Sequence, residues 1–320
     1  MIAKRMRLFA GTAHPEFARK LGEHLGLTPD PSEAFHFTDG NLFVKIGVNV
    51  RGYEVFLVQT LSPPVNDHLM ELIFLIDACK RASSGPVTAV IPYYSYALAD
   101  KKDEPRVSIR GRIIADLLET AGVDRVLTMD LHSPQIQGFF RKPVDHLYAM
   151  PVLAEDFRAR AIPDLVVVSP DMGFAKRARH FALLLDSPVA IGDKVRRGHE
   201  ERAEVLSIVG DVRGCNALIV DDIIVSGTSL VSLAEVLVRE GAKEIYAAAT
   251  HGVLSEGAVE RLAASPIKEV VITDTLPLPP EKHHPKIRQV SVTPLFAEAI
   301  RRIHEEESVS FLFQDHPPPP

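Results

Sequence analysis

The sequence has no tryptophan and only two cysteines in 320 residues. The pair Cys79 and Cys215 is too small for a disulfide framework or a zinc cage. No apolar run approaches the roughly 20 residues that a membrane span needs, and the N-terminal segment lacks the apolar core of a signal peptide. We therefore expect a soluble, cytoplasmic protein with no membrane partner.

An excess of basic residues is also missing, since the net charge is -6 at pH 7. A nucleic-acid-binding protein normally presents a basic face, so this class is not expected. Basic residues are nevertheless concentrated locally, at 176–179 and 194–197. Such local clusters in an acidic protein suit small polyanionic ligands.

Apolar runs alternate with helical patterns along nearly the whole chain, which predicts an α/β fold with parallel sheets covered on both faces. The length favours two domains, and the strand candidates divide near Met150 and Pro151. We expect two sheets of about five strands. The strands expected for the first sheet are residues 7–10, 42–46, 55–58, 87–91 and 125–129. Those expected for the second are 165–169, 189–191, 217–220, 245–248 and 270–273. Helices are expected at 69–82, 112–121 and 231–240.

The stretch ALIVDDIIVSGTSL, residues 217–230, carries the most chemistry. Its first four apolar residues predict a buried strand with Asp221 and Asp222 at the carboxyl end. Ligands of open α/β sheets bind at this edge, where a helix N-terminus offers N–H groups to an anion. The carboxylates suit ribose hydroxyls or magnesium, and the loop hydroxyls suit a phosphate. An ordinary capped helix is the simpler interpretation, but one cap does not need two acids and three hydroxyls. The loop residues are Ser226, Gly227, Thr228 and Ser229.

Other candidates are ambiguous when taken one at a time. His132 follows an expected strand, but a lone histidine is more often a structural hydrogen-bonding residue than a metal ligand. Asp171 ends another expected strand in a Pro/Gly turn, where acids commonly only form the turn. The turn FTDGN, residues 37–41, is a hairpin signal as much as a base-binding one. Asp100 begins a charged segment that on its own reads as a solvated surface.

Taken together, these pieces resemble the phosphate- and magnesium-dependent ribose-phosphate pyrophosphokinases, also called phosphoribosyl pyrophosphate synthetases. The resemblance runs nearly end to end in ordered blocks, which chance similarity does not produce. The blocks are FTDGN, NVRG, PVNDHLMELIFLIDACKRASS, TAVIPYYSYALADKKDEPR, DRVLTMDLHSPQIQGFFRKPVDHLYAMP, VVVSPDMGFAKRAR, GDKVRR, ALIVDDIIVSGTS, THG and ESVSFLF.

The resemblance implies two type I phosphoribosyltransferase-like domains related by a pseudo-twofold axis. The domains would cover 1–150 and 151–301, with 302–316 packing back onto the first and 317–320 forming a disordered proline tail. It also implies an enzyme, a ribose-phosphate diphosphokinase. This enzyme transfers the diphosphoryl group of ATP to the 1-hydroxyl of ribose 5-phosphate, with Mg²⁺ as cofactor, and releases AMP.

The same resemblance implies a role for each candidate residue. The loop aspartates and the four loop residues would bind ribose 5-phosphate, and Lys194 and Arg196 would be the catalytic cations of a mobile loop at 192–202. Residues at two segments would bind ATP, with the first contributed across a dimer interface, and one residue from each domain would bind the metal. The ATP residues are Phe37, Asp39, Asn41, Asp100 and Lys102; the metal ligands are His132 and Asp171.

Assembly and regulation are implied in the same way. The resemblance predicts a homohexamer built from dimers, with phosphate as activator and ADP as inhibitor. Both effectors would bind at a site between subunits. Its expected residues are Arg51, Arg81, Ser83, Ser308 and Ser310.

Two alternatives to an active synthetase remain. Leu98 and Ala99 stand where the family usually has an Arg-Gln pair, and Val225 replaces an acid of the sugar loop. A catalytically weak paralogue that regulates or assembles with an active synthetase would tolerate these changes. A phosphoribosyltransferase, which consumes the product, is the less favoured alternative because such enzymes rarely need two full domains.

Overall fold

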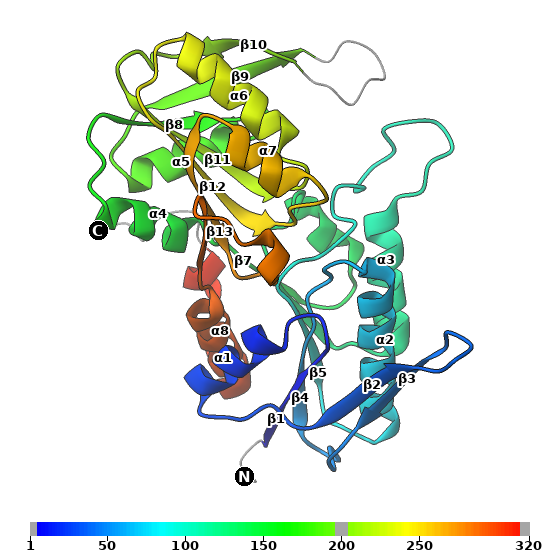
Figure 1. Cartoon of the computed structure of the whole chain (residues 1–320). Helices are drawn as coiled ribbons and strands as arrows, with labels where there is room; N and C mark the ends of the chain where they lie inside the picture. The colour runs from blue at the N-terminus through cyan, green and yellow to red at the C-terminus, as the bar shows by residue number, and fades with distance from the viewer. Residues whose placement is uncertain (1–4, 196–203, 314–320) are drawn as a thin grey trace. The chain divides into compact units, whose positions relative to one another are not determined.

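The computed structural model describes residues 5–195 and 204–313, which form two units (Figure 1). The first comprises residues up to Tyr148, the short segment Thr275–Pro277 and the C-terminal segment Thr293–Phe313. The second comprises Ala149–Asp274 and Leu278–Val292. The returning segment therefore begins at Thr293 rather than at about Arg302, and the expected proline tail, 317–320, lies outside the described residues.

The first unit contains a five-stranded parallel sheet. Every residue of β4 and of β5 is buried, as expected of strands covered on both faces. In spatial order the strands are β1 (Met6–Ala10), β4 (Glu54–Val58), β5 (Val87–Ile91), β6 (Arg125–Met129) and β7 (Val144–Leu147). Its helices are α1 (Pro15–Leu25), α2 (Val65–Arg81), α3 (Arg110–Ala121), α8 (Thr293–Glu305) and the 3-10 helices η1 (Pro134–Phe139) and η3 (Ser310–Phe313).

One expected strand of this sheet lies elsewhere. Residues 42–46 form β3 (Leu42–Ile46), which pairs only with β2 (Ser32–His36) in a separate antiparallel hairpin. The fifth place in the sheet is taken by β7, which the sequence did not predict. Its sequence, VDHL, is short and half polar, so it carries no strand periodicity.

The C-terminal helix α8 packs on α1 at the N-terminal end of the chain (Figure 1). The rings of Phe17 and Phe296 are in an edge-to-face contact with centroids 5.4 Å apart, and both side chains are fully buried. Edge-to-face pairs stabilise a core beyond their buried area, so this contact holds the returning segment on the first unit.

The second unit contains a seven-stranded sheet that is parallel except at one edge, where β10 runs antiparallel to β9. The sheet has two strands more than expected, because the sequence did not predict the short β14 or β10, which begins with a polar residue. In spatial order the strands are β10 (Glu204–Val209), β9 (Val189–Val195), β8 (Leu165–Ser169), β11 (Asn216–Ile224), β12 (Ile245–Gly252), β13 (Ile267–Thr273) and β14 (Ile287–Val290). Its helices are α4 (Met150–Ala159), α5 (Ala175–Leu184), α6 (Thr228–Arg239), α7 (Ala258–Ala264) and the 3-10 helix η2 (Pro280–Lys282).

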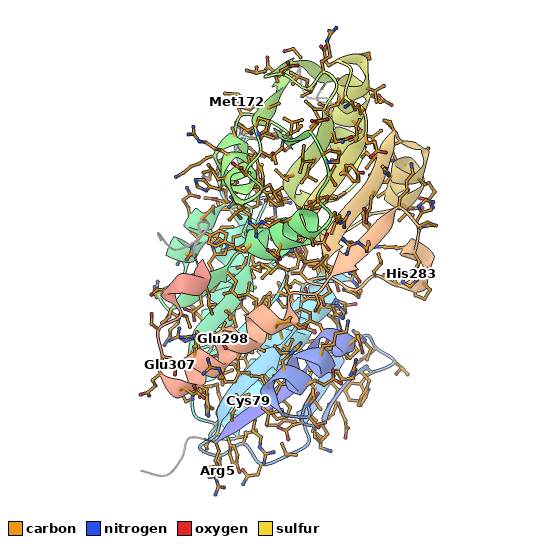
Figure 2. All side chains as sticks on the ribbon, turned by 90° about the vertical axis from the view of Figure 1, so that its left-hand side faces the viewer. Arg5, Cys79, Met172, His283, Glu298 and Glu307 are labelled. Carbon is orange, nitrogen blue, oxygen red and sulfur yellow. The ribbon has the colours of Figure 1, made fainter. Side chains whose placement is uncertain are left out.

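Both cysteines are free thiols. Cys79 lies on α2, where Figure 2 labels it, and burial raises the pKa of its thiol to about 12. A thiol with such a pKa is protonated at neutral pH and behaves as a small apolar side chain. None of the helices in the described part of the chain has the length and hydropathy of a membrane span.

Candidate functional site

The two adjacent acids lie inside the central strand of the second sheet, not after its end. β11 was expected to stop at residue 220, but it continues to Ile224 because it stays paired with β12, where Asp221 lies opposite Ala249. Its pairing with β8 ends earlier, at Ile219. The acids therefore lie beyond the paired part of β8, at the carboxyl edge of that side of the sheet.

The two carboxylates have different surroundings. Asp222 is only 4% exposed, whereas Asp221 is partly exposed, and one oxygen of Asp221 accepts the backbone N–H of Asp222 at 2.9 Å. A buried carboxylate has a large desolvation cost, and proteins retain such a group where it has partners or a function. The pair thus presents one carboxylate toward solvent and one within the sheet.

The loop after β11 is shorter than expected, because α6 begins at Thr228 rather than at residue 231. Gly227 is its N-cap, with a φ of 73° that favours glycine. Neither aspartate is the N-cap, so capping does not explain the acids. The N–H groups of the first helical turn have no acceptor within the helix, and Ser226 Oγ lies 3.2 Å from Thr228 Oγ1. Such a helix start can bind an anion.

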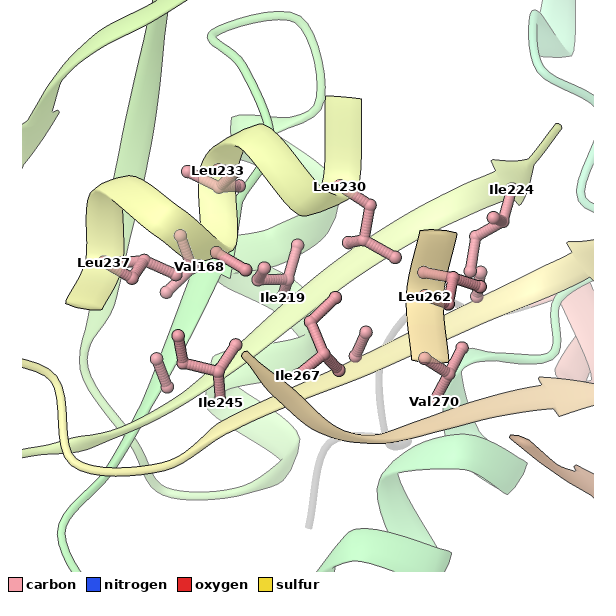
Figure 3. Packing of buried hydrophobic residues seen from close by; sticks show 14 of the residues in the cluster. Val168, Ile219, Ile224, Leu230, Leu233, Leu237, Ile245, Leu262, Ile267 and Val270 are labelled. Carbon is pink, nitrogen blue, oxygen red and sulfur yellow. The ribbon is translucent and has the colours of Figure 1, made fainter. Parts of the chain in front are cut away.

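Apolar contacts fix the position of this helix start. Leu230, Leu233 and Leu237 of α6 are buried in the core of the second unit with Ile219 of β11 and Leu262 of α7 (Figure 3). Because the helix begins directly above this cluster, its first turn cannot shift without disturbing the core. The loop is therefore held by packing as well as by its own hydrogen bonds.

Asp171 lies near the same edge, two residues after the end of β8. One of its carboxylate oxygens accepts the N–H of Phe174 at 3.0 Å, so the acid forms the turn that the simpler interpretation predicts. Since β8 and β11 are parallel neighbours, the structure brings Asp171, Asp221 and Asp222 to one edge of the second sheet. A turn-forming role and a ligand role are compatible, because a carboxylate has four lone-pair positions.

His132 belongs to the first unit, whereas Asp171 belongs to the second. It is exposed and follows β6, after Asp130, whose φ is 38°. The N–H of Leu131 donates to Nε2 of the buried His146 at 2.8 Å. This bond fixes the backbone directly before His132, a contribution of His146 that no local sequence pattern indicated. Within the described ranges, no three His, Cys, Asp or Glu side chains are grouped closely enough to hold a metal ion.

The residues expected to bind ATP lie on two segments of the first unit. Phe37, Asp39 and Asn41 form the turn between β2 and β3, where Asp39 accepts the backbone and side-chain N–H groups of Asn41 at 3.0 and 2.8 Å. The hairpin interpretation of this turn is confirmed. Phe37 is 50% exposed and packs beside Phe35, so a ring face or edge is open to a ligand.

The second segment, with Asp100 and Lys102, follows β5 and leads into α3; Lys102 is exposed and Asp100 half-buried. Behind it, the buried Tyr94 hydroxyl donates to the Gly111 carbonyl at 3.2 Å. Burial raises the pKa of Tyr94, which keeps this phenol protonated and able to donate. This hydrogen bond holds the backbone in place where the charged segment joins α3.

Of the two cations expected to be catalytic, the structure describes only one. Lys194 is a residue of β9 and pairs with Val205 of β10, whereas the sequence predicted a mobile loop from residue 192. That expectation was wrong for 192–195, because pairing with the unrecognised β10 extends β9 to Val195. Arg196 lies outside the described residues.

The expected effector residues lie in two places on the first unit. Arg51 forms an isolated bridge with Ser84, and the neighbouring Gly52 N–H donates to the Ser83 carbonyl at 3.0 Å, so Arg51 and Ser83 are close through the backbone. Arg81 is bonded to Asp77 on the exposed side of α2. Ser308 and Ser310 have hydroxyls 3.0 Å apart at the start of η3, which packs by β7.

Comparisons with known proteins agree with the fold described above. Residues 6–122 match the N-terminal domain of ribose phosphate pyrophosphokinase, and residues 184–314 match the phosphoribosyl synthetase-associated domain. A ribose-phosphate pyrophosphokinase of Caldanaerobacter subterraneus is 54% identical over 96% of this chain and 98% of its own length. One of Clostridium acetobutylicum is 51% identical over 98% of both. The crystal structure of phosphoribosylpyrophosphate synthetase from Mycobacterium smegmatis superposes with a TM-score of 0.90 at 40% identity, over 95% of this chain and 100% of its own.

Proposed function

The chain belongs to the ribose-phosphate pyrophosphokinase family, and from this premise we propose that it synthesises 5-phospho-α-D-ribose 1-diphosphate. The diphosphoryl group of ATP passes to the 1-hydroxyl of ribose 5-phosphate, and AMP is released. One observation of the second unit carries the proposal: the acid pair of β11 and the start of α6 lie next to each other at one edge of the sheet. A phosphosugar needs both an acceptor for its hydroxyls and a donor set for its phosphate.

In this proposal the sugar is bound at both of its ends. The carboxylates of Asp221 and Asp222 accept hydrogen bonds from the ribose hydroxyls. The N–H groups and hydroxyls of Ser226, Gly227, Thr228 and Ser229 donate to the 5-phosphate. Exposure supports this division at both ends of the sugar, because Ser226 and Ser229 are exposed and Asp221 is partly exposed.

The chemical step joins two anionic substrates. The 1-hydroxyl oxygen forms a bond to the β-phosphorus of ATP, the bond from that phosphorus to the α,β-bridging oxygen breaks, and the hydroxyl proton is released. In such transfers catalysis comes mainly from positioning and charge neutralisation. On the sequence resemblance, we assign charge neutralisation to Lys194 and Arg196. The acid pair of β11 would position the sugar.

Magnesium fits the donor chemistry of this edge. Mg²⁺ prefers one or two carboxylates together with substrate phosphates and waters, so a site does not require three protein ligands in a group. Partly exposed carboxylates of this kind are present in Asp171 and Asp221. When bound, the ion neutralises phosphate charge; His132 and Asp171 are the ligands that the resemblance indicates.

His132→Asn tests the metal assignment in the first unit. The side chain is exposed, so the substitution should leave the free energy of unfolding nearly unchanged. If His132 is a ligand, the Mg²⁺ concentration that gives half-maximal turnover should rise about tenfold or more. The control is His24→Asn, which replaces an exposed histidine in the last turn of α1. Identical Mg²⁺ dependence in both variants would exclude His132 from the site.

ATP is assigned to the hairpin turn and the charged segment of the first unit. The half-exposed ring of Phe37 can stack on a base, because aromatic side chains bind bases through their faces. The side chains of Asp39 and Asn41 are hydrogen-bonded to each other and can recognise polar edges of the base. Asp100 and Lys102 complete the assignment, with the lysine as the phosphate-binding cation.

The homohexamer, its effectors phosphate and ADP, and the cytoplasmic location stay predictions. Arg51 offers a test of the effector site, because its side chain is exposed and its backbone contacts survive truncation. We expect Arg51→Ala to raise the ADP concentration for half-inhibition about tenfold, and to raise the phosphate concentration needed for activation as well, because both effectors are assigned to this site. Light scattering gives the oligomeric state, and a monomer would contradict the assembly.

A substrate-omission assay tests the proposed function itself. AMP should form only when the protein, Mg²⁺, ATP and ribose 5-phosphate are all present. If ribose 5-phosphate binds but AMP does not form at any phosphate concentration, the chain is the weak paralogue. If 5-phospho-α-D-ribose 1-diphosphate is instead consumed when a nucleobase is added, the phosphoribosyltransferase alternative is correct.

A further inference from the structure

The loop between β11 and α6 is held from one side by a short segment that the sequence did not single out. The backbone N–H of Ser255 donates to the Val225 carbonyl at 2.9 Å, and its hydroxyl donates to the same oxygen at 3.2 Å. The guanidinium of Arg261 donates to the next carbonyl, that of Ser226. Two consecutive carbonyls of the loop are therefore anchored by one segment, 255–261.

These anchors determine where the loop N–H groups point. In a trans peptide the C=O and the N–H point in opposite directions, and the loop peptides are trans. With the carbonyls of Val225 and Ser226 turned toward 255–261, the N–H groups of Ser226 and Gly227 must face the opposite side. The first-turn N–H groups of α6 follow directly. Successive N–H groups of this kind form an anion-binding concavity.

Arg261 is itself held in place by its neighbours. It lies on α7, whose Leu262 is fully buried in the core of the second unit (Figure 3). A Cβ on Gly227 would lie 3.4 Å from the Leu262 side chain, so the loop and α7 pack closely. The guanidinium thus approaches the loop from a helix that cannot easily move away.

We propose that Arg261 is a positioning residue for ribose 5-phosphate: it orients the peptide between Ser226 and Gly227 so that the loop N–H groups face the 5-phosphate. The inference rests on the proposed function, because that function identifies the ligand. Arg261 does not touch the reacting atoms. Its positive charge also lowers the electrostatic cost of placing a phosphate at the loop. The hydrogen bond to the Ser226 carbonyl, however, is the contact that sets the direction of the loop N–H groups.

Kinetics of two substitutions test this role. Arg261→Met removes the donor, and we expect the KM for ribose 5-phosphate to rise about tenfold while kcat and the KM for ATP change by less than about twofold. This split follows because the phosphate is bound equally in the ground state and the transition state. Arg261→Lys keeps a donor and a charge, so it should recover most of the lost affinity. Arg239→Met, which replaces an exposed arginine in the last turn of α6, is the matched control.

Calorimetric titration with ribose 5-phosphate separates failure of this inference from failure of the proposed function. Wild-type protein that neither binds ribose 5-phosphate nor forms AMP would overturn both. If the wild-type protein binds or turns over ribose 5-phosphate, and Arg261→Met has the same affinity and KM for this sugar, the positioning role alone would be overturned. A merely structural role would lower the Tm and the active fraction, and therefore kcat, without raising the KM for the sugar; that result would also contradict the proposal.

Discussion

Replacing both acids of β11, in the double variant Asp221→Asn with Asp222→Asn, is expected to lower kcat/KM for ribose 5-phosphate about a thousandfold. This loss corresponds to about 4 kcal/mol of transition-state stabilisation. Asparagine keeps the size of each side chain but removes both negative charges, so the sugar hydroxyls keep only weaker, neutral acceptors and the metal loses anionic ligands. Steady-state kinetics with varied ribose 5-phosphate and fixed ATP give the value.

Stability must be measured beside activity, because the strand-end position expected from the sequence was wrong. Asp222 is 4% exposed inside β11, so its replacement should lower the free energy of unfolding by about 1–3 kcal/mol. Asp221 is partly exposed, and the amide oxygen of an asparagine in its place can still accept the N–H of Asp222. The matched control is Asp211→Asn, an exposed acid before the same strand that likewise accepts a nearby backbone N–H, from Arg213 at 3.0 Å. If the folded double variant turned over as fast as this control, the acids would have only a structural role.

Truncation of the two proposed catalytic cations is the second large effect. Lys194→Ala and Arg196→Ala should each lower kcat about a hundredfold, a loss of about 2.7 kcal/mol, with much smaller changes in either KM. The reason is that a cation assigned to the transferred diphosphoryl group is needed most when charge develops in the transition state. The comparison is Lys176→Ala, an exposed lysine of α5 in another basic cluster. Full turnover in both variants would leave the reaction without its proposed charge neutralisation.

The strands that carry the site were predictable because they are buried on both faces. Continuous apolar runs identified β8, β11 and β12, and the parallel arrangement then brought Asp171 and the acid pair to one edge. The strands that were missed are edge strands or short polar ones, such as β2 (SEAFH) and β14 (IRQV). Their formation depends on pairing with a neighbour, which local periodicity does not record.

The finer geometry of the site depends on contacts distant in sequence. The continuation of β11 through Asp221 is set by β12, and the direction of the loop carbonyls is set by Ser255 and Arg261, roughly thirty positions away. The α7 stretch AVERLAA reads as an ordinary amphipathic helix, so nothing in it marks Arg261. Such tertiary contacts could not be inferred from one sequence, although the residue types at the sheet edge could.

The most direct measurement follows the phosphorus atoms of ATP through one reaction. The pure protein is incubated with Mg²⁺, ATP and ribose 5-phosphate, and ³¹P NMR resolves the products. The account predicts AMP and 5-phospho-α-D-ribose 1-diphosphate in equal amounts, with both the β- and γ-phosphorus of ATP in the new 1-diphosphate. ADP with a ribose bisphosphate, which would mean transfer of a single phosphoryl group, or unchanged ATP under all phosphate concentrations, would contradict it.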